Sequence, residues 1–548
     1  MASLPVADSP TKVEFTLGRT LLWLGIAVVF TTLQIQQSLN SGKLMFGFML
    51  DDDMGYYRDG LQRLYFLQRD GMIKLLNRLV TIPPHALGGT LFALLGFAVF
   101  GVHDWAPSAA RGLVIFGLII FIAEYLCRGF TLGWKLLVVA LALTWRVIGV
   151  TVVEGRPDII LGLLLAIGIV LVTESSWLQS SWQKQVIAGA FFGAAFVCKP
   201  SMSPITLFLL VATLLTASLI DIWRERSNRQ NLLSVNAYCL GTTLAVMAPY
   251  YLVHGRSAIK YFIDVIFGQG SEVWHVDLSL VGHALFYLNG MGGEWLIGHH
   301  WLGVWILFVI ITLMIFWRNH RGSFWQSLLK NAPLSLGIMM FLTWLVLSVP
   351  KTKGGYFGAA LAGLFLLTTI QMLVFFLRQW QNSAAPQYRL GFWLGGLGLL
   401  IFAWGQFKWP AVGADPERWR SAYRITEQIT GDVRNEIPPN AKIFLLSRGY
   451  LDIAGYHILK RRAGRKYELP RYNSFILNDL PTNQKLLAQA DYVIVETDAD
   501  HQSRWPAYPQ MPTLLAAIQS PQFRLWREYP DYLSDKGGKI LIYRRVSK

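Results

Sequence analysis

The sequence has few cysteines and few charged residues. Its three cysteines, Cys127, Cys198 and Cys239, form neither a zinc-ligand spacing nor a disulfide framework, and their apolar surroundings indicate core positions. Only 15% of the 548 residues are charged, which argues against an ordinary soluble domain. No internal repeat stands out, which argues against the repeat symmetry of many transporters. No HExxH spacing supports a metal site at the histidines.

Hydrophobic residues make up 53% of the chain, and its mean hydropathy is +0.39. Many apolar runs reach roughly 17–20 residues, the length at which a helix crosses a bilayer. The net charge of +16 would suggest nucleic acid as the partner of a soluble protein. Here the cations cluster in short loops, as the positive-inside rule describes, and some can meet anionic lipid headgroups. We therefore predict a polytopic α-helical membrane protein that contacts membrane lipids and binds no nucleic acid.

The apolar runs predict eleven spans. They cover residues 20–38, 111–127, 134–150, 159–173, 186–197, 205–221, 234–253, 301–317, 333–349, 359–377 and 390–407. Lys12 and Arg19 precede the first run, and no convincing cleavage site follows it, so we expect an uncleaved span rather than a signal peptide.

Loop charges predict the orientation. Cations gather at 224–229, 318–330 and 378–389 and in the turn at 128–135, which the positive-inside rule assigns to the cytoplasm. If the N-terminus is cytoplasmic as well, these loops all lie in the cytoplasm only when the apolar run 86–100 does not cross the membrane. We therefore predict a re-entrant or interfacial helix there. The segments outside, on the periplasmic side of a bacterial inner membrane, are then 39–110, 151–158, 198–204, 254–300, 350–358 and everything after residue 408.

The chain changes character after residue 408. Residues 409–548 are rich in Arg, Pro, Asn and Asp, with short β-like runs at 441–446, 492–496, 523–528 and 539–543. An amphipathic stretch at 417–435 predicts a helix. We expect residues 1–408 to form the membrane domain and residues 409–548 a small extracytoplasmic α/β domain.

Unusual polar residues all fall on the predicted outer side. Asp51, Asp52 and Asp53 follow the first span, where clustered acids mark chemistry more often than packing. One of them can remove a proton from a hydroxyl group. Cations that can hold a phosphate and stabilise its charge lie in or near the other outer segments: Lys353, Lys351, Arg256, His254, Lys199 and Arg146. Lipid-linked sugar phosphates present such a leaving group at the membrane surface.

Other polar residues are candidates for positioning an acceptor: Glu154, Arg156, Asp158, Tyr56, Tyr57 and Tyr356. Simpler interpretations exist, since Asp158 can cap the following helix, Arg156 can pair with the acids and Lys199 can snorkel. Glu124 lies inside a span near its cytoplasmic end, where we expect a structural hydrogen bond.

Four stretches resemble the GT-C superfamily of glycosyltransferases that use polyprenyl-phosphate-linked sugars. They are the acidic pair and tyrosine at 52–56, Pro-Pro-His-Ala-Leu-Gly at 83–88, the small-residue helix ending in Lys199-Pro200, and the loop at 348–356. Within the superfamily, the sequence is similar to protein O-mannosyltransferases and the lipid A aminoarabinose transferase, over roughly residues 15–408. The triple aspartate leaves open which member is the base, and Arg156-Pro157-Asp158 matches the family pattern loosely.

The resemblance implies one inverting transfer of a sugar from a polyprenyl phosphate, such as undecaprenyl phosphate, to an acceptor hydroxyl. An aspartate acts as base, and a lateral gap for the lipid tail lies near the 350–358 loop and the 86–100 helix. The acceptor is a glycan, a lipid or a protein of the cell envelope. The acidic cluster permits a divalent cation as cofactor and does not require one.

Other functions remain open. A transporter or flippase for lipid-linked sugars would spread polar residues through the spans. A non-catalytic subunit of an envelope-assembly complex would tolerate neutral substitution of the aspartates. An O-antigen ligase or polymerase would use a diphosphate donor and an Arg/His pair.

Overall fold

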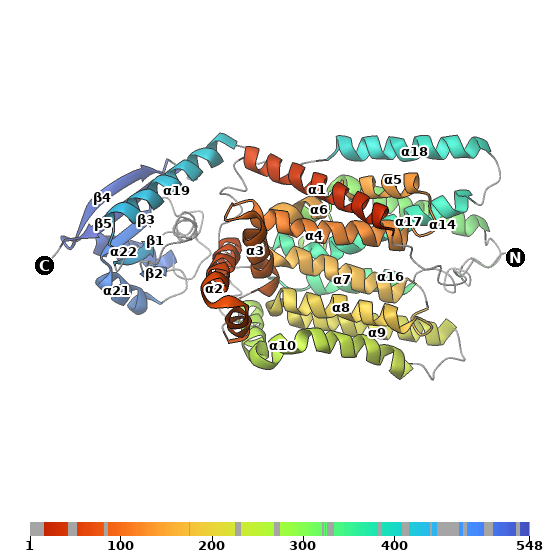
Figure 1. Ribbon diagram of the computed structural model, residues 1–548, viewed down its shortest axis with the longest axis horizontal. Coiled ribbons are helices and arrows are strands. Elements are labelled where there is room, and N and C mark those ends of the chain that lie inside the picture. Colours follow the sequence, from red (N-terminus) through yellow and green to blue (C-terminus); the bar gives the residue numbers. More distant parts are fainter. Residues whose placement is uncertain are drawn as a thin grey trace.

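The structure, a computed structural model, consists mainly of helices, with one small sheet near the C-terminal end (Figure 1). It describes residues 16–41, 52–81, 86–174, 176–224, 232–267, 275–319, 323, 325, 334–381, 386–407, 416–438, 441–446, 471–474, 479–497, 508–532 and 537–546.

Long apolar helices form a bundle, and each overlaps one predicted span (Figure 1). They are α1 (Leu17–Asn40), α4 (Ala106–Ile120), α7 (Pro157–Thr173), α8 (Trp182–Cys198), α9 (Ser203–Arg224), α10 (Leu232–Phe267), α14 (His299–Asn319), α16 (Leu334–Ser348), α17 (Ala359–Gln381) and α18 (Pro386–Gly405). By length and composition, five helices of the described chain can cross a membrane, or six if one bent pair is a single span. The count of eleven spans stays a prediction.

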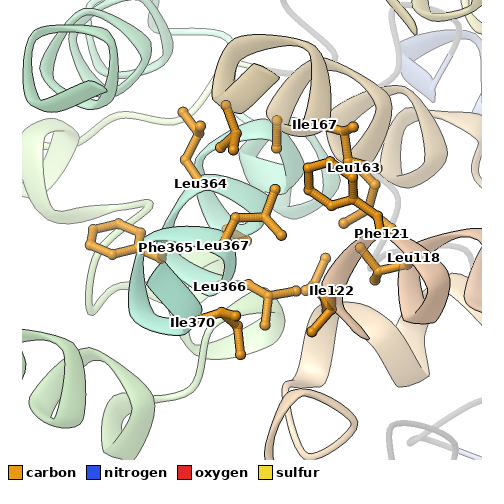
Figure 2. Close-up of a cluster of buried hydrophobic side chains, with 14 of the residues drawn as sticks. Leu118, Phe121, Ile122, Leu163, Ile167, Leu364, Phe365, Leu366, Leu367 and Ile370 are labelled. Carbon is orange, nitrogen blue, oxygen red and sulfur yellow. The ribbon is translucent and has the colours of Figure 1, made fainter. Parts of the chain in front are cut away.

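The core of the bundle lies around α17 and α7. Figure 2 shows Leu364 and Leu367 of α17 near Leu163 of α7 and near Phe121, which belongs to the π-helical continuation of α4, η2 (Phe121–Leu126). A Cβ on Gly162 of α7 would lie 2.5 Å from the backbone of α17. The small residue therefore permits the close contact of these two helices.

The predicted span 134–150 is a broken helix pair, and the break was not predicted. α5 (Leu132–Ala142) and α6 (Arg146–Val153) meet at a bend of 69°. At the break, the Thr144 hydroxyl donates to the Leu141 carbonyl at 2.6 Å. Trp145 is fully buried in an extended conformation and stacks on Trp301 at 4.7 Å between ring centroids. The helix is therefore interrupted at the position where the Trp145 ring packs against Trp301.

The outer segment expected from residue 254 begins as helix, because α10 continues to Phe267. Its polar residues Arg256 and Lys260 are exposed, whereas Ala258 is buried. This stretch is therefore a helix rather than a loop, and it also exposes apolar side chains such as Ile259 and Ile263. Whether the membrane span ends at residue 253 stays a prediction.

Two helices lie across the end of the bundle, between it and the sheet: α2 (Asp52–Thr81) and α3 (Leu87–Phe100) (Figure 1). α2 was missed because it is polar, and it bends at Gly71, whose φ of +81° favours glycine. α3 packs tightly on α2, since a Cβ on Gly60 would lie 2.6 Å from that of Ala93. α3 occupies the ambiguous apolar run 86–100, and whether it crosses a membrane stays a prediction.

Shorter elements connect the bundle helices around the same region. They are η3 (Pro200–Met202), α12 (Leu280–Leu285), α13 (Met291–Leu296) and η5 (Gly355–Gly358).

The C-terminal sheet has the order β2-β1-β3-β5-β4. Its strands are β1 (Lys442–Leu446), β2 (Arg471–Ser474), β3 (Tyr492–Glu496), β4 (Phe523–Pro530) and β5 (Lys539–Arg545). β1 pairs with β2 and β3 in parallel, and β5 pairs antiparallel with β3 and β4. The four predicted strands and the predicted helix, α19 (Pro416–Glu436), are confirmed, whereas the short β2 was missed.

Alternating residues of the sheet feed two apolar cores. Phe444 and Val493 face the core that contains α21 (Leu480–Gln489) and α22 (Met511–Ile518), which follows η7 (Tyr508–Gln510). Ile443 and Ile494 lie in the other core with α19, and that core continues to Tyr57 of α2 and residues of α3. The sheet is thereby joined to the end of the bundle that carries α2 and α3.

Candidate active site

Lys199, at the end of α8, connects two other segments. Its Nζ donates a hydrogen bond of 3.0 Å to the Tyr56 hydroxyl and lies 3.4 Å from an Asp158 carboxylate oxygen. All three residues are at least 94% buried. Burial of a charge is costly unless it is paired, so Lys199 is not a snorkelling side chain. Asp158 does not cap α7 either, because Arg156 occupies the N-cap position and no side chain caps there.

Glycines bring α3 against this network. A Cβ on Gly88 would overlap the Cys198 Sγ, and one on Gly89 would lie 2.8 Å from the Tyr56 ring. Gly88 ends one of the stretches that resemble the GT-C superfamily, Tyr56 ends another, and Cys198 precedes Lys199 in a third. The fold therefore brings three of the four stretches together.

Two of the three aspartates lie at the start of α2. Asp52 and Asp53 are its first two residues, one helical turn before Tyr56 and Tyr57. Their side chains and all of Asp51 lie outside the described residues. Acidic residues suit the first turn of a helix, where the backbone dipole is positive.

Tyr57 has a partner that sequence reasoning missed. Arg111 of α4, which is fully buried, donates to the Tyr57 hydroxyl at 3.2 Å and also to the Val152 and Glu154 carbonyls. Arg111 is the first residue of the predicted span 111–127, and a charged residue at that position was the one sign in the sequence of a buried polar contact. Buried Glu154 contributes its main-chain oxygen here, at the turn before Arg156.

The loop at 349–354 places Lys353 in a buried position. Its Nζ donates to the Leu347 and Ser348 carbonyls at 2.8 Å each, at the end of α16, and lies 5.3 Å from the centre of the Tyr287 ring. Burial lowers the pKa of Lys353 to about 8. Exposed Lys351 uses its carbonyl to accept from the Val276 amide.

A cleft lies between this loop, η3 and α10. Lys199 lines it beside hydroxyl groups and apolar side chains, including Tyr287, Thr352, Tyr356, Phe262 and Leu347. The Arg156 guanidinium lies 4.4 Å from the centre of the Tyr356 ring. The fourth stretch of the resemblance thus meets Lys199, and the cleft combines one ammonium group with a mostly apolar wall.

Five predicted cations do not line the cleft: Lys351, Lys353, Arg146, His254 and Arg256. Arg146 forms an ion pair of 3.0 Å with Glu294 of α13, which also lies 3.1 Å from His299 Nε2. His254 and Arg256 lie on α10, where Arg256 is exposed.

Within the described part of the chain, no three His, Cys, Asp or Glu side chains are grouped to hold a metal ion. Asp51, Asp52 and Asp53 are outside that set. Glu124, inside a predicted span, makes the expected structural hydrogen bond. Its carboxylate accepts from Trp23 Nε1 at 2.8 Å and forms an ion pair with Lys135.

A bundle of apolar helices, crossing helices at one end and a small sheet beyond them make up the fold (Figure 1). Two crystal structures of ArnT from Cupriavidus metallidurans share it. The structure bound to undecaprenyl phosphate aligns with a TM-score of 0.53 and 13% identity, and the apo structure with 0.54 and 14%. Both alignments cover 96% of this chain and 98% of ArnT.

No family model and no curated protein matches the sequence. The resemblance to the lipid A aminoarabinose transferase is confirmed at the level of the fold. The expected architecture of many apolar helices with a small C-terminal sheet agrees with it, and the membrane topology stays a prediction.

Proposed function

We propose that the protein is a membrane glycosyltransferase that moves a sugar from a polyprenyl phosphate, of the undecaprenyl type, to an acceptor hydroxyl. One observation carries the proposal. Lys199 lies in a mostly apolar cleft and is hydrogen-bonded to Tyr56, one turn from Asp52 and Asp53. A cation, a lipid-compatible wall and a carboxylate-bearing helix end therefore adjoin one another, in a fold shared with a protein that binds undecaprenyl phosphate.

The donor phosphate is assigned to the Lys199 side of the cleft. Its ammonium group and nearby hydroxyls can hold phosphate oxygens, and Lys353 can join them by leaving the α16 carbonyls. Apolar side chains from α10 and α16, Phe262 and Leu347 among them, line the same cleft and suit the first isoprene units. The lipid tail leaves between these helices into the bilayer.

In the proposed reaction, the acceptor oxygen attacks the anomeric carbon while the bond from that carbon to the phosphate oxygen breaks. The lipid phosphate departs with the bonding electrons, and cations stabilise its charge. The acceptor proton passes to Asp53 or Asp52. A single displacement inverts the anomeric configuration, and no strong acid is needed because the phosphate is a good leaving group.

We assign the acceptor to the region between α2, the turn carrying Glu154 and Arg156, and the C-terminal unit of residues 409–548. This side is the periplasmic side in the proposed orientation, as the loop charges indicate. The sheet is joined to α2 and α3 through one apolar core, which supports a shared acceptor surface.

The test is a comparison of donors with purified protein in liposomes. We expect transfer from a labelled undecaprenyl-phosphate sugar, no transfer from the matching diphosphate, and no translocation of the labelled lipid without transfer. Transfer from the diphosphate alone would favour a ligase or polymerase. Translocation without transfer would favour a flippase, and either result would contradict the proposal.

A further inference from the structure

Arg111 is a buried cation whose contacts are made by its two Nη atoms. Its side chain is 0% exposed, and its partners are two main-chain carbonyls and one hydroxyl group. The structure pairs it with no carboxylate among the described residues. An arginine in this position is expensive, so a specific geometry must depend on it.

The carbonyls of Val152 and Glu154 lie at the end of α6, where a helix has unsatisfied acceptors and a negative dipole end. A lysine or a water molecule could satisfy such a helix end. Arg111 does more, because its other Nη reaches the Tyr57 hydroxyl on α2 at 3.2 Å. The planar guanidinium therefore fixes two chain segments relative to each other, which a single ammonium group cannot do with the same geometry.

The two segments carry different parts of the proposed chemistry. The α6–α7 turn continues into Arg156, which lies over Tyr356, and Asp158, which pairs with Lys199. On α2, Tyr57 follows Asp53 by one turn. If either segment moved by about 1 Å, the aspartate base would no longer be correctly placed relative to the donor sugar. Such a displacement can lower the rate about 100-fold.

We infer that Arg111 is a positioning residue that sets the aspartate-bearing turn of α2 against the α6–α7 turn, with Tyr57 as its link. The inference rests on the proposed glycosyl transfer. It assigns Arg111 no contact with substrate, so its loss lowers kcat and leaves the KM for the donor unchanged.

The experiment compares Arg111→Lys, Tyr57→Phe and their combination in purified full-length protein. We expect kcat to fall about 100-fold in Arg111→Lys and about 10-fold in Tyr57→Phe, with unchanged donor KM. The combination should be no slower than Arg111→Lys, because both changes remove one link. Trp23→Phe is the matched control, since it removes a buried hydrogen bond to Glu124, and Trp23 belongs to a different apolar core from Tyr57.

Hydrogen exchange of the α2 amides gives a readout that does not need activity. Arg111→Lys and Tyr57→Phe should speed exchange in residues 55–60, and Trp23→Phe should not. Any of three results would overturn the inference. The first is exchange at the wild-type rate in Arg111→Lys, and the second is additive losses of kcat in the combined variant. The third is an equal loss of kcat in Trp23→Phe when both variants lose the same melting temperature. An inactive wild type with faster exchange in the variants would overturn the glycosyl transfer instead, and leave the positioning role standing.

Discussion

The Lys199 ammonium group donates a hydrogen bond of 3.0 Å to the Tyr56 hydroxyl, and this bond ties the end of α8 to the first turns of α2. The same ammonium group pairs with Asp158 at the start of α7. Three segments that are distant in the sequence therefore meet at one buried charge. In the proposed mechanism, stability and donor binding depend on the same group.

Replacement of Lys199 by methionine separates these two roles. Lys199→Met leaves Asp158 buried without its cation, which should cost about 3–5 kcal/mol of stability. Adding Asp158→Leu removes the stranded carboxylate and should restore most of that stability, but not the affinity for the donor. Melting temperature in detergent and donor KM are the two measurements. Equal stability of the single variant and the wild type would contradict the buried ion pair.

The close approach of α3 gives a packing prediction. Gly88→Ala and Gly89→Ala should each destabilise the protein by about 1–3 kcal/mol, because the new methyl groups meet Cys198 and Tyr56. Gly117→Ala in α4 is the control, since nothing lies within 4 Å of its Cβ position, and it should be neutral or slightly stabilising. Thermal unfolding of the three variants decides the matter, and equal effects at all three sites would refute the packing.

Lys353 predicts a pH dependence of donor binding. Burial lowers its pKa to about 8, so the group loses its proton as the pH rises through that value. If the charged form binds the phosphate, the apparent donor KM should rise about 10-fold between pH 7 and pH 9. A bound phosphate would itself raise the pKa, so the measurement must use low donor concentrations.

Lys353→Arg is the control for this titration, because arginine stays protonated throughout the range. Its donor KM should be nearly independent of pH between 7 and 9. A parallel rise of KM in the wild type and in Lys353→Arg would assign the pH dependence to another group. A flat profile in the wild type would contradict the role of Lys353.

Local patterns predicted much of the fold. β3 matched the run at 492–496, and α19 followed from its amphipathic pattern. α2 was not predicted, because it is polar and has no apolar run long enough to suggest a membrane span. Which of its residues are buried depends on its contact with α3, which the sequence does not give. The bend before Arg146 was missed since it depends on the packing of Trp145 against Trp301, residues far apart in the sequence.

The candidate site was predicted as a set of residues but not as a set of contacts. Lys199 and Asp158 were chosen for their charge and location, and the structure pairs them. Lys353 was expected at the donor, and its present partners are carbonyls of α16. Arg111 was missed because its role depends on three acceptors from two segments, the end of α6 and α2, which no local pattern encodes.

The measurement that tests the central claim most directly is sugar transfer by Asp53→Asn and Asp52→Asn, each compared with the wild type at equal amounts of folded protein. Removal of the general base should lower kcat at least about 100-fold in one of them, with little change in donor KM. The neutral amide keeps the shape of the side chain, so the melting temperature should stay close to that of the wild type. Wild-type transfer rates in both variants would contradict aspartate catalysis at the start of α2.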